Sequence, residues 1–386
     1  MKHRNIIFHQ LLQFLPRYRF QEAVDRHQGD HRVRKLSCWD QFVVMLFGQL
    51  SNRKSLRDLV DTFNSKRAHH YHLGTRIVNR SSLSDANSRR PVAVFKETFF
   101  YLLNQVKDKH CAKVSNEMVR LIDSTTIDLN LTHYEWASFR TTKAGVKLHT
   151  VFDPSAEVPV YFEMTRAKTS DRKALSMLPV LPGMTYVVDR AYNDYKWYYQ
   201  LTKQKSVFVG RMKSNALYDV IETCEPEGEG IIGDEIIKLS SEKAKKDCPI
   251  SLRRITFVRK EDQKTLVFIT NDMTRTATEI AELYKQRWQI ELFFKWIKQN
   301  LKIKRFLGQS ENAVLIQVLV AMIAYLLIKL VELSYKTAFS LQQIARIISV
   351  NLTSRQPMLC LLNPPPDPPK NCTERVNQLD LGFKYV

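Results

Sequence analysis

Residues 276–308 read TATEIAELYKQRWQIELFFKWIKQNLKIKRFLG, and the interpretation of the whole chain starts from this segment. Thr276 and Glu279 have the spacing of a capping box, in which each side chain bonds the backbone of the other residue. No glycine or proline follows before Gly308, so nothing in the segment interrupts a helix. The segment therefore predicts one long helix.

One face of this predicted helix carries its polar side chains. At about 100° per residue, five of them fall on one narrow stripe: Tyr284, Arg287, Glu291, Lys295 and Lys298. The other positions are largely apolar, which predicts that they are buried and that the polar stripe lines a cleft. Glu291 lies alone among basic residues. Either it forms ordinary ion pairs with Arg287 and Lys295, or it is a metal-binding carboxylate framed by cations that bind phosphate.

Charge and composition limit the class of partner. The chain of 386 residues has 59 lysines and arginines against 39 acidic residues, a net charge of +20. This excess favours a polyanionic partner such as nucleic acid, with an anionic membrane surface as the alternative. The start of the chain lacks the apolar core of a signal peptide, and the apolar run 313–328 is short for a membrane span. The six cysteines include no Cys-x-x-Cys pair. We therefore expect no membrane, no zinc site and a reducing cytoplasm.

Residues 5–65 have a helical pattern, and a further helix is expected at about 92–107. Ser37 and Asp40 open one apolar segment, and residues 55–63 form a second segment after a short basic connection. The pair is typical of either a DNA-binding helix-turn-helix or two ordinary packed helices. Residues 66–91 are strongly basic, and we expect them to form a loop or arm that lies against phosphates.

The middle of the chain changes to a β pattern. Runs rich in β-branched and aromatic residues predict strands at 119–123, 146–152, 158–164, 186–189, 206–210 and 266–270, with a helix at 192–203. This order predicts an α/β fold. Residues 219–247 hold nine acids against four lysines, so 211–264 is interpreted as an acidic, β-rich insertion. Helices are expected at 313–333 and 341–350, followed by a polyproline-like tail at 363–369.

Two further carboxylates occupy positions that favour a shared site with Glu291. Asp123 and Asp189 each end a predicted apolar strand, and ligands of open α/β sheets bind at such strand ends. Alternatively, each aspartate caps the following turn. Together the three acids could hold two divalent ions that activate a water or a 3′-hydroxyl and stabilise the leaving oxygen. Arg287 is one turn from Glu291 and is placed for the reacting phosphate, whereas Lys298 should reach a flanking one.

These residues also carry a resemblance. The pattern Tyr284-x2-Arg287-x3-Glu291-x6-Lys298 resembles the Tyr-Arg-Glu-Lys signature of DDE transposases from the fourth family of bacterial insertion sequences. Asp123-Ser-Thr and Asp189-Arg-x-Tyr resemble the two strand-end motifs that supply the other metal ligands. Similarity extends over about residues 30–350 and includes Ser82-x-x-Asp85-x-Asn87-x-x-Arg90 and Lys147-x-His149.

The resemblance implies a domain organisation and a set of site residues. An RNase H-like catalytic domain would comprise 111–210 and 265–310, interrupted by the insertion 211–264. A helical domain, 1–110, would bind DNA ends, and 311–386 would form a helical C-terminal region. The catalytic and metal-binding residues would be Asp123, Asp189 and Glu291, and the DNA contacts would come from Tyr284, Arg287, Lys295 and Lys298.

The same resemblance implies a reaction. It consists of Mg²⁺-dependent cleavage of double-stranded DNA at the element's ends, followed by transfer of the 3′ ends to target DNA. Two Mg²⁺ ions are expected, with Mn²⁺ as a substitute, in a homodimeric synaptic complex that works at the bacterial nucleoid. Some relatives pass through a DNA hairpin and hold a flipped base with a tryptophan of the insertion, but this chain has none between Trp197 and Trp288. The alternatives are an RNase H-like nuclease without strand transfer and a catalytically inactive DNA-binding relative.

Overall fold

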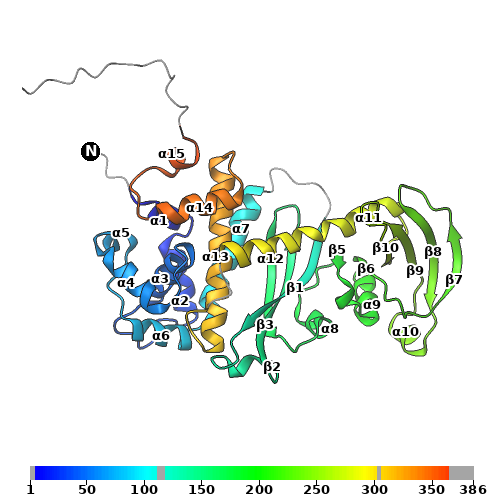
Figure 1. Cartoon of the computed structure of the whole chain (residues 1–386), viewed down its shortest axis with the longest axis horizontal. Helices are drawn as coiled ribbons and strands as arrows, with labels where there is room; N and C mark the ends of the chain where they lie inside the picture. The colour runs from blue at the N-terminus through cyan, green and yellow to red at the C-terminus, as the bar shows by residue number, and fades with distance from the viewer. Residues whose placement is uncertain (1–4, 111–117, 302–305, 365–386) are drawn as a thin grey trace, which may run out of the picture.

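The computed structural model describes residues 5–110, 118–301 and 306–364. A group of helices lies at one end of the molecule and a long sheet at the other, with α13 (Glu311–Tyr335) standing between them (Figure 1). The expected α/β class is confirmed, because strands and helices share one mixed architecture.

The N-terminal part is helical throughout. Its helices are α1 (Ile7–Leu12), α2 (Arg17–Arg26), α3 (Cys38–Leu50), α4 (Leu56–Ser65), α5 (His70–Leu73), α6 (Arg80–Arg89) and α7 (Val92–His110). Helix α3 begins at the capping box of Ser37 and Asp40, and all its residues are buried. In the predicted pair of helices, only α4 therefore reaches the surface.

The expectation of a loop or arm over 66–91 is wrong. A short 3₁₀ helix, Arg67–His69, together with α5 and α6, occupies most of this segment. The reason is a set of apolar side chains among the basic ones: Leu73, Val78 and Leu83 are buried in the core and tie the segment down.

In the part of the chain that the structure describes, ten strands form one sheet. They are β1 (Val119–Leu129), β2 (Ser138–Arg140), β3 (Lys143–Asp153), β4 (Val158–Arg166), β5 (Thr185–Val188), β6 (Val207–Arg211), β7 (Tyr218–Cys224), β8 (Ile231–Leu239), β9 (Leu252–Val258) and β10 (Thr265–Thr270). Their order is β2-β3-β1-β5-β6-β10-β9-β8-β7, and β4 pairs with β3. Strands β1, β5 and β6 run parallel, and the other pairs are antiparallel. The acidic segment 211–264 extends this sheet through β7, β8 and β9.

Strand β1 is longer than predicted, so Asp123 lies inside it and does not end it. Residues Ser124–Leu129 continue in antiparallel register with β3, from Ser124 opposite His149 to Leu129 opposite Ala144. The β-branched residues of this part favour the extended conformation. The parallel pairing with β5, in contrast, stops at Ile122.

The predicted long helix is two helices in line, α11 (Ala277–Gln286) and α12 (Trp288–Asn300). The break is at Arg287, where the backbone tightens to three-residue hydrogen bonds: the Arg287 N–H bonds the Tyr284 carbonyl at 3.1 Å, and the Ile290 N–H bonds the Arg287 carbonyl at 3.3 Å. The two helices cross the sheet toward α13 (Figure 1). Burial of the apolar side of α12 is incomplete, because Trp288 and Leu292 are 58% and 47% exposed.

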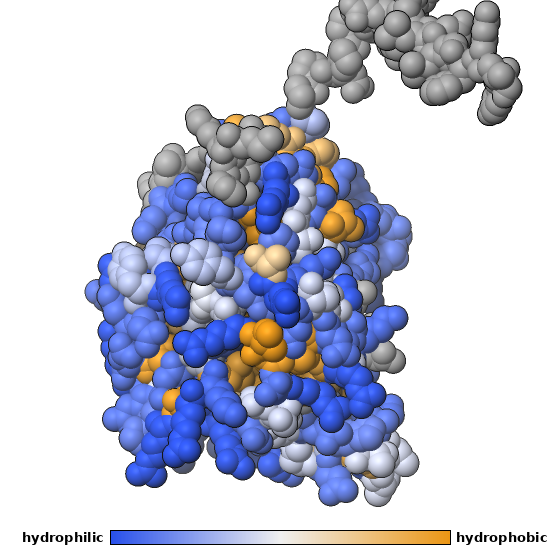
Figure 2. Space-filling view, turned by 90° about the vertical axis from the view of Figure 1, so that its left-hand side faces the viewer, coloured by the Kyte–Doolittle hydropathy of each residue, from blue (hydrophilic) through white to orange (hydrophobic). Residues whose placement is uncertain are grey.

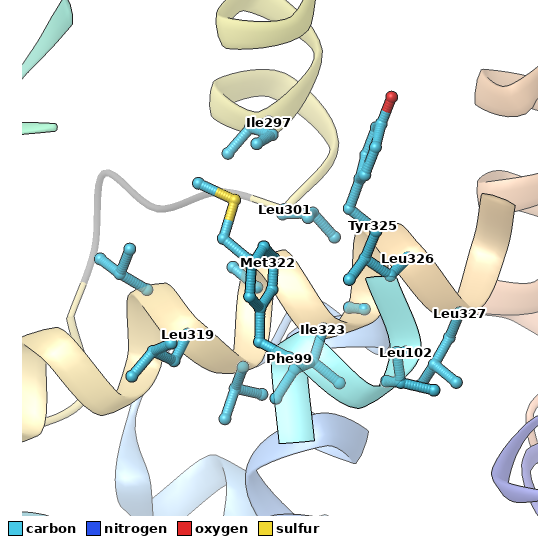
Figure 3. Close-up of a cluster of buried hydrophobic side chains, with 14 of the residues drawn as sticks. Phe99, Leu102, Ile297, Leu301, Leu319, Met322, Ile323, Tyr325, Leu326 and Leu327 are labelled. Atoms are coloured by element: carbon cyan, nitrogen blue, oxygen red, sulfur yellow. The ribbon is translucent and has the colours of Figure 1, made fainter. Parts of the chain in front are cut away.

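Helix α13 is the centre of the hydrophobic core. By length and composition it could span a membrane, but 94% of its most apolar window is buried inside the protein. Figure 3 shows Leu319, Met322, Ile323 and Leu326 of α13 among side chains of α7 and α12. Helices α14 (Leu341–Asn351) and α15 (Met358–Leu362) follow. Most of the predicted polyproline-like tail lies outside the described residues.

Candidate active site

Strand register brings two of the predicted acids together. In the parallel pair of β1 and β5, Ile122 lies opposite Val188. Asp123 and Asp189 directly follow these two residues in the sequence. Both therefore lie where the parallel pairing of β1 and β5 ends, at the same edge of the sheet.

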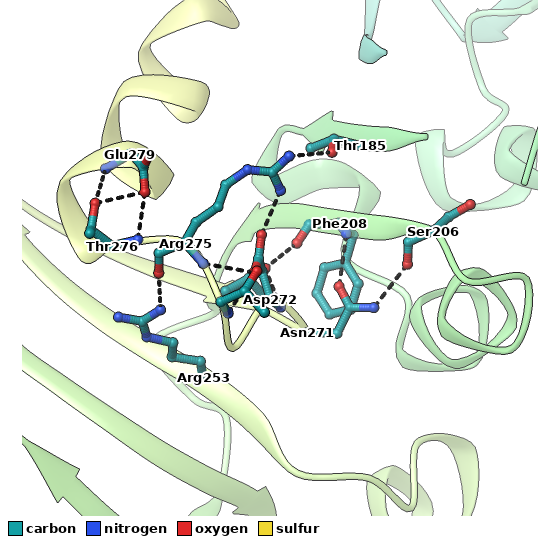
Figure 4. A network of polar contacts seen from close by, with 11 residues as sticks. Thr185, Ser206, Phe208, Arg253, Asn271, Asp272, Arg275, Thr276 and Glu279 are labelled. Atoms are coloured by element: carbon teal, nitrogen blue, oxygen red, sulfur yellow. Dashed lines mark hydrogen bonds and ion pairs between the residues drawn. The ribbon is translucent and has the colours of Figure 1, made fainter. Parts of the chain in front are cut away.

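A hydrogen-bonded turn fixes the helix that brings the third acid. After β10, Asp272 accepts hydrogen bonds from the backbone N–H groups of Thr274 and Arg275, at 2.9 and 3.1 Å. The predicted capping box of Thr276 and Glu279 then starts α11 (Figure 4). Because this turn ties the sheet to α11, it sets where α11 and α12 cross the strand ends.

A cavity of about 510 Å³ opens where β1, β5 and α12 meet. Its lining includes every predicted site residue except Tyr284, and comprises Asp123, Ser124, Thr125, Asp189, Arg287, Glu291, Phe294, Lys295, Lys298 and Gln299. Tyr284 is buried beside it, and its hydroxyl donates to Asp189 Oδ1 at 3.3 Å. Acids from three separate segments therefore share one cavity with basic residues of α12.

Arg287 connects two of the acids. Its Nη1 lies 3.2 Å from Asp123 Oδ2, and its Nη2 lies 2.6 Å from Glu291 Oε1. The ordinary ion pair of Glu291 with Arg287 thus forms, while the same guanidinium also reaches across to β1. Among the described residues, no three acidic, histidine or cysteine side chains lie close enough to hold one metal ion.

The cavity lining has three acids and three basic residues, but burial disfavours the charged form of one of the acids, Asp123. Burial, together with the nearby charges of Asp189 and Glu291, raises the pKa of Asp123 to about 6. The Ser124 N–H, which donates to Asp123 Oδ1 at 2.7 Å, and the Arg287 charge oppose this rise without cancelling it. A carboxylate that is costly to ionise beside other carboxylates favours the binding of another cation.

Arg287 and Tyr284 keep their protons. Burial opposes the charge of Arg287, but Tyr284 and the three acids outweigh it and raise the pKa of this guanidinium. Burial raises the pKa of Tyr284 to about 12, so its hydroxyl remains a donor to Asp189. Carboxylate oxygens are the ligands that hard divalent ions prefer, so the chemistry of the donor set fits such ions.

Two residues of the motif Ser82-x-x-Asp85-x-Asn87-x-x-Arg90 are buried, Asn87 and Arg90, and both have structural roles. The Gln41 side-chain amide donates to Asn87 Oδ1 at 2.8 Å, and Arg90 Nη1 pairs with Asp30 at 2.7 Å. Asn312 of α13 donates to the backbone carbonyls of Asn87 and Arg90, at 2.9 and 3.0 Å. The motif thus ties the N-terminal helices to the core helix α13. Asn312 is 222 residues from Arg90 in the sequence, so no local pattern indicates this contact.

Sequence reasoning missed Asp171, at the start of α8 (Asp171–Ala174). In the sequence it is an ordinary acidic residue in the first turn of a helix that Ser170 caps. In the structure its carboxylate accepts a hydrogen bond from the Ser124 hydroxyl at 2.6 Å, next to Asp123. The contact spans 47 residues of sequence, so only the fold brings the two residues together.

Comparison with known proteins places the chain in a family. The sequence profile of the Transposase DDE domain matches residues 115–327, which include all the predicted catalytic residues. The chain belongs to the DDE transposase family. A second profile, of a domain of unknown function (DUF4372), matches residues 3–76.

Relatives of this DDE transposase occur in several bacteria. A protein described as transposase y4zB of Sinorhizobium fredii is 38% identical over 309 residues, which are 79% of this chain and 86% of the relative. A transposase for the insertion sequence element IS5377 of Geobacillus stearothermophilus is 30% identical over 215 residues, 55% of this chain and 56% of the relative. A piggyBac transposase in a synaptic complex with hairpin DNA aligns with a TM-score of 0.46 at 13% identity, over 91% of this chain and 81% of that one.

Family membership establishes the activity. The protein is a DNA transposase, a metal-dependent enzyme that cleaves DNA and transfers strands. Divalent metal ions are general in this family.

Proposed function

We propose that Asp123, Asp189 and Glu291 are the catalytic, metal-binding carboxylates of this transposase, and that they hold two Mg²⁺ ions, with Mn²⁺ as a substitute. The observation that carries the proposal is the meeting of these acids from β1, β5 and α12 in one cavity. When bound, the ions would activate a water or a 3′-hydroxyl and stabilise the leaving oxygen. The parallel strands and the acid-bearing helix support assignment of 111–210 and 265–310 to an RNase H-like catalytic domain, with 211–264 inserted into its sheet.

The other polar residues of α11 and α12 then have separate roles. Arg287 neutralises Asp123 and Glu291 when the metal is absent, and must exchange these partners for a DNA phosphate when ions enter. Its planar fork suits such an exchange, because it binds carboxylate and phosphate with the same geometry. The Tyr284 hydroxyl orients one oxygen of Asp189. Lys295 and Lys298 lie further along α12 and contact phosphates of the flanking nucleotides.

We propose further that the helical domain 1–110 binds the ends of the element. Its exposed side at α4, α5 and α6 is mostly hydrophilic (Figure 2). A pocket of about 540 Å³ between the starts of α4 and α6 is lined by Ser55, Leu56, Arg57, Arg80, Ser81 and Ser84. Arginines and hydroxyls with no acid among them are suited to a DNA phosphate. The region 311–386 contributes the core helix α13, which joins this domain to the catalytic one.

The complete reaction places two copies of the chain on double-stranded DNA. We propose that a homodimer holds two element ends and a target in the bacterial cytoplasm, at the nucleoid. The net charge of +20 supports contact with this much phosphate.

A cleavage and joining assay tests the proposal. The protein is incubated with Mg²⁺ and linear DNA that carries the repeats flanking its own gene, and nicked, hairpinned and joined products are separated. Asp123→Ala, Asp189→Ala and Glu291→Ala should each abolish cleavage while DNA binding persists. Asp194→Asn is the matched control, because Asp194 caps α9 (Tyr195–Lys203) outside the cavity lining. Cleavage by any of the three alanine variants would remove that residue from the site.

A further inference from the structure

A partly buried polar cluster lies beside the cavity and contacts the two segments that carry Asp123 and Asp189. We call it the Asp171 cluster, and it consists of Ser124, Lys147, His149, Thr165, Asp171 and Tyr192. These residues come from β1, β3, β4, α8 and the turn Arg190–Tyr192 after β5. Of the six, only Ser124 lines the cavity.

Asp171 is the acceptor at the centre of this cluster. Its Oδ1 accepts from the Ser124 hydroxyl at 2.6 Å, and its Oδ2 lies 3.3 Å from Lys147 Nζ. His149 Nδ1 approaches Oδ1 at 3.6 Å. The Lys147 and Asp171 side chains are only 15% and 17% exposed, so this pair is held largely away from solvent.

His149 and Tyr192 extend the cluster toward the second aspartate. His149 is fully buried, which lowers its pKa to about 4 and leaves a neutral ring with one donor and one acceptor nitrogen. Tyr192 hydroxyl at 3.0 Å and Thr165 hydroxyl at 3.0 Å satisfy these two nitrogens. The Tyr192 N–H also bonds the Asp189 carbonyl at 3.0 Å.

The cluster therefore touches the backbone on which each aspartate sits. Ser124 directly follows Asp123, and its N–H holds Asp123 Oδ1, while its hydroxyl is held by Asp171. A network whose buried members are all paired restricts the segments that it joins. We propose that Asp171 is a positioning residue: through Ser124 it fixes the orientation in which Asp123 presents its carboxylate to the metal. This inference rests on the proposed metal site.

The chain contains a matched control for the decisive bond. At the other end of β3, the Ser155 hydroxyl donates to Asp153 Oδ1 at the same distance, 2.6 Å. That serine and aspartate are also partly buried, and neither lines the cavity. Ser155→Ala thus removes the same kind of bond from the same sheet without touching the Asp171 cluster.

The experiment measures Mn²⁺ affinity of the full-length protein by electron paramagnetic resonance, with no DNA present. Ser124→Ala and Asp171→Asn should weaken Mn²⁺ binding roughly 10- to 100-fold, the range typical of residues that orient metal ligands. Ser124→Thr, which keeps the hydroxyl, should restore affinity close to that of the wild type. Ser155→Ala should leave it unchanged. Thermal melting of each variant identifies any that fail to fold, and Ser124→Ala is the milder change because it leaves the Lys147–Asp171 pair intact.

The outcomes separate this inference from the proposed function. If Asp123→Ala binds Mn²⁺ as the wild type does, the metal site itself is wrong. If Asp123→Ala loses Mn²⁺ but folded Ser124→Ala and Asp171→Asn keep it, the metal site stands and the positioning role of Asp171 is overturned. An equal loss in Ser155→Ala would also overturn it, because the effect would then belong to the sheet as a whole. In single-turnover nicking at saturating DNA, the rate should fall for Ser124→Ala while the DNA dissociation constant does not change.

Discussion

Asp123→Asn should stabilise the metal-free protein at neutral pH even though it removes a residue of the proposed catalytic set. Burial raises the pKa of Asp123 from 3.8 to about 6, and its side chain is only 16% exposed. Because the folded-state pKa is the higher one, protonation of Asp123 stabilises the fold below about pH 4, and this stabilisation is lost as the pH rises through about 6. A difference of about 2 units corresponds to about 3 kcal/mol.

Urea unfolding in EDTA at several pH values measures this effect. At pH 7.5 the Asp123→Asn protein should have a free energy of unfolding higher by up to about 3 kcal/mol, and the advantage should shrink toward zero as the pH falls to about 4. Asp153→Asn is the contrasting control, because Asp153 lies 2.9 Å from Arg120 in a buried pair and its loss should destabilise the protein. An Asp123→Asn protein that is less stable than the wild type at pH 7.5, or whose advantage does not vary with pH, would show that Asp123 is a structural acid.

Four further predictions concern DNA contacts and the N-terminal motif. If phosphate contacts dominate DNA binding, affinity should fall roughly 10³- to 10⁵-fold between about 50 and 200 mM salt for six to ten contacts, and a salt-insensitive complex would assign the basic surface another role. Arg287→Lys keeps the charge but loses the fork that joins Asp123 to Glu291, so single-turnover cleavage should slow at saturating DNA. Lys298→Ala should impair joining more than the first nick. If Arg287→Lys, Lys298→Ala and the wild type react at equal rates on intact and pre-nicked ends, the proposed roles of Arg287 and Lys298 are contradicted. Arg90→Met breaks a partly buried ion pair with Asp30, whose side chain is 29% exposed, and should lower the free energy of unfolding by about 1 to 3 kcal/mol, measured by urea titration, whereas an unchanged value would leave the motif without its structural role.

Local periodicity predicted the side-chain positions on which the site depends. The stripe from Tyr284 to Lys298 follows from the geometry of one helix, and it persists across the break at Arg287 because both helices keep the same line. The meeting of Asp123 with Asp189 followed from a simple rule about strand ends, although β1 itself continues past Asp123.

Long-range packing decided what the sequence could not reveal. Nothing local distinguishes Asp171 from an ordinary residue at a helix start, because its partner Ser124 is 47 residues away. The basic segment 66–91 resembled an arm because its charges are numerous, yet a few buried apolar residues fold it into helices. The bridging position of Arg287 depends equally on where α12 crosses β1, which is set by the turn at Asp272 and by packing against α13.

The most direct test of the metal site is a crystal of the protein soaked in Mn²⁺ and measured for anomalous scattering. We predict anomalous peaks among the carboxylates of Asp123, Asp189 and Glu291, with the Arg287 guanidinium moved away from Asp123. Peaks at other residues only, with Arg287 still joining Asp123 to Glu291, would contradict the proposed site.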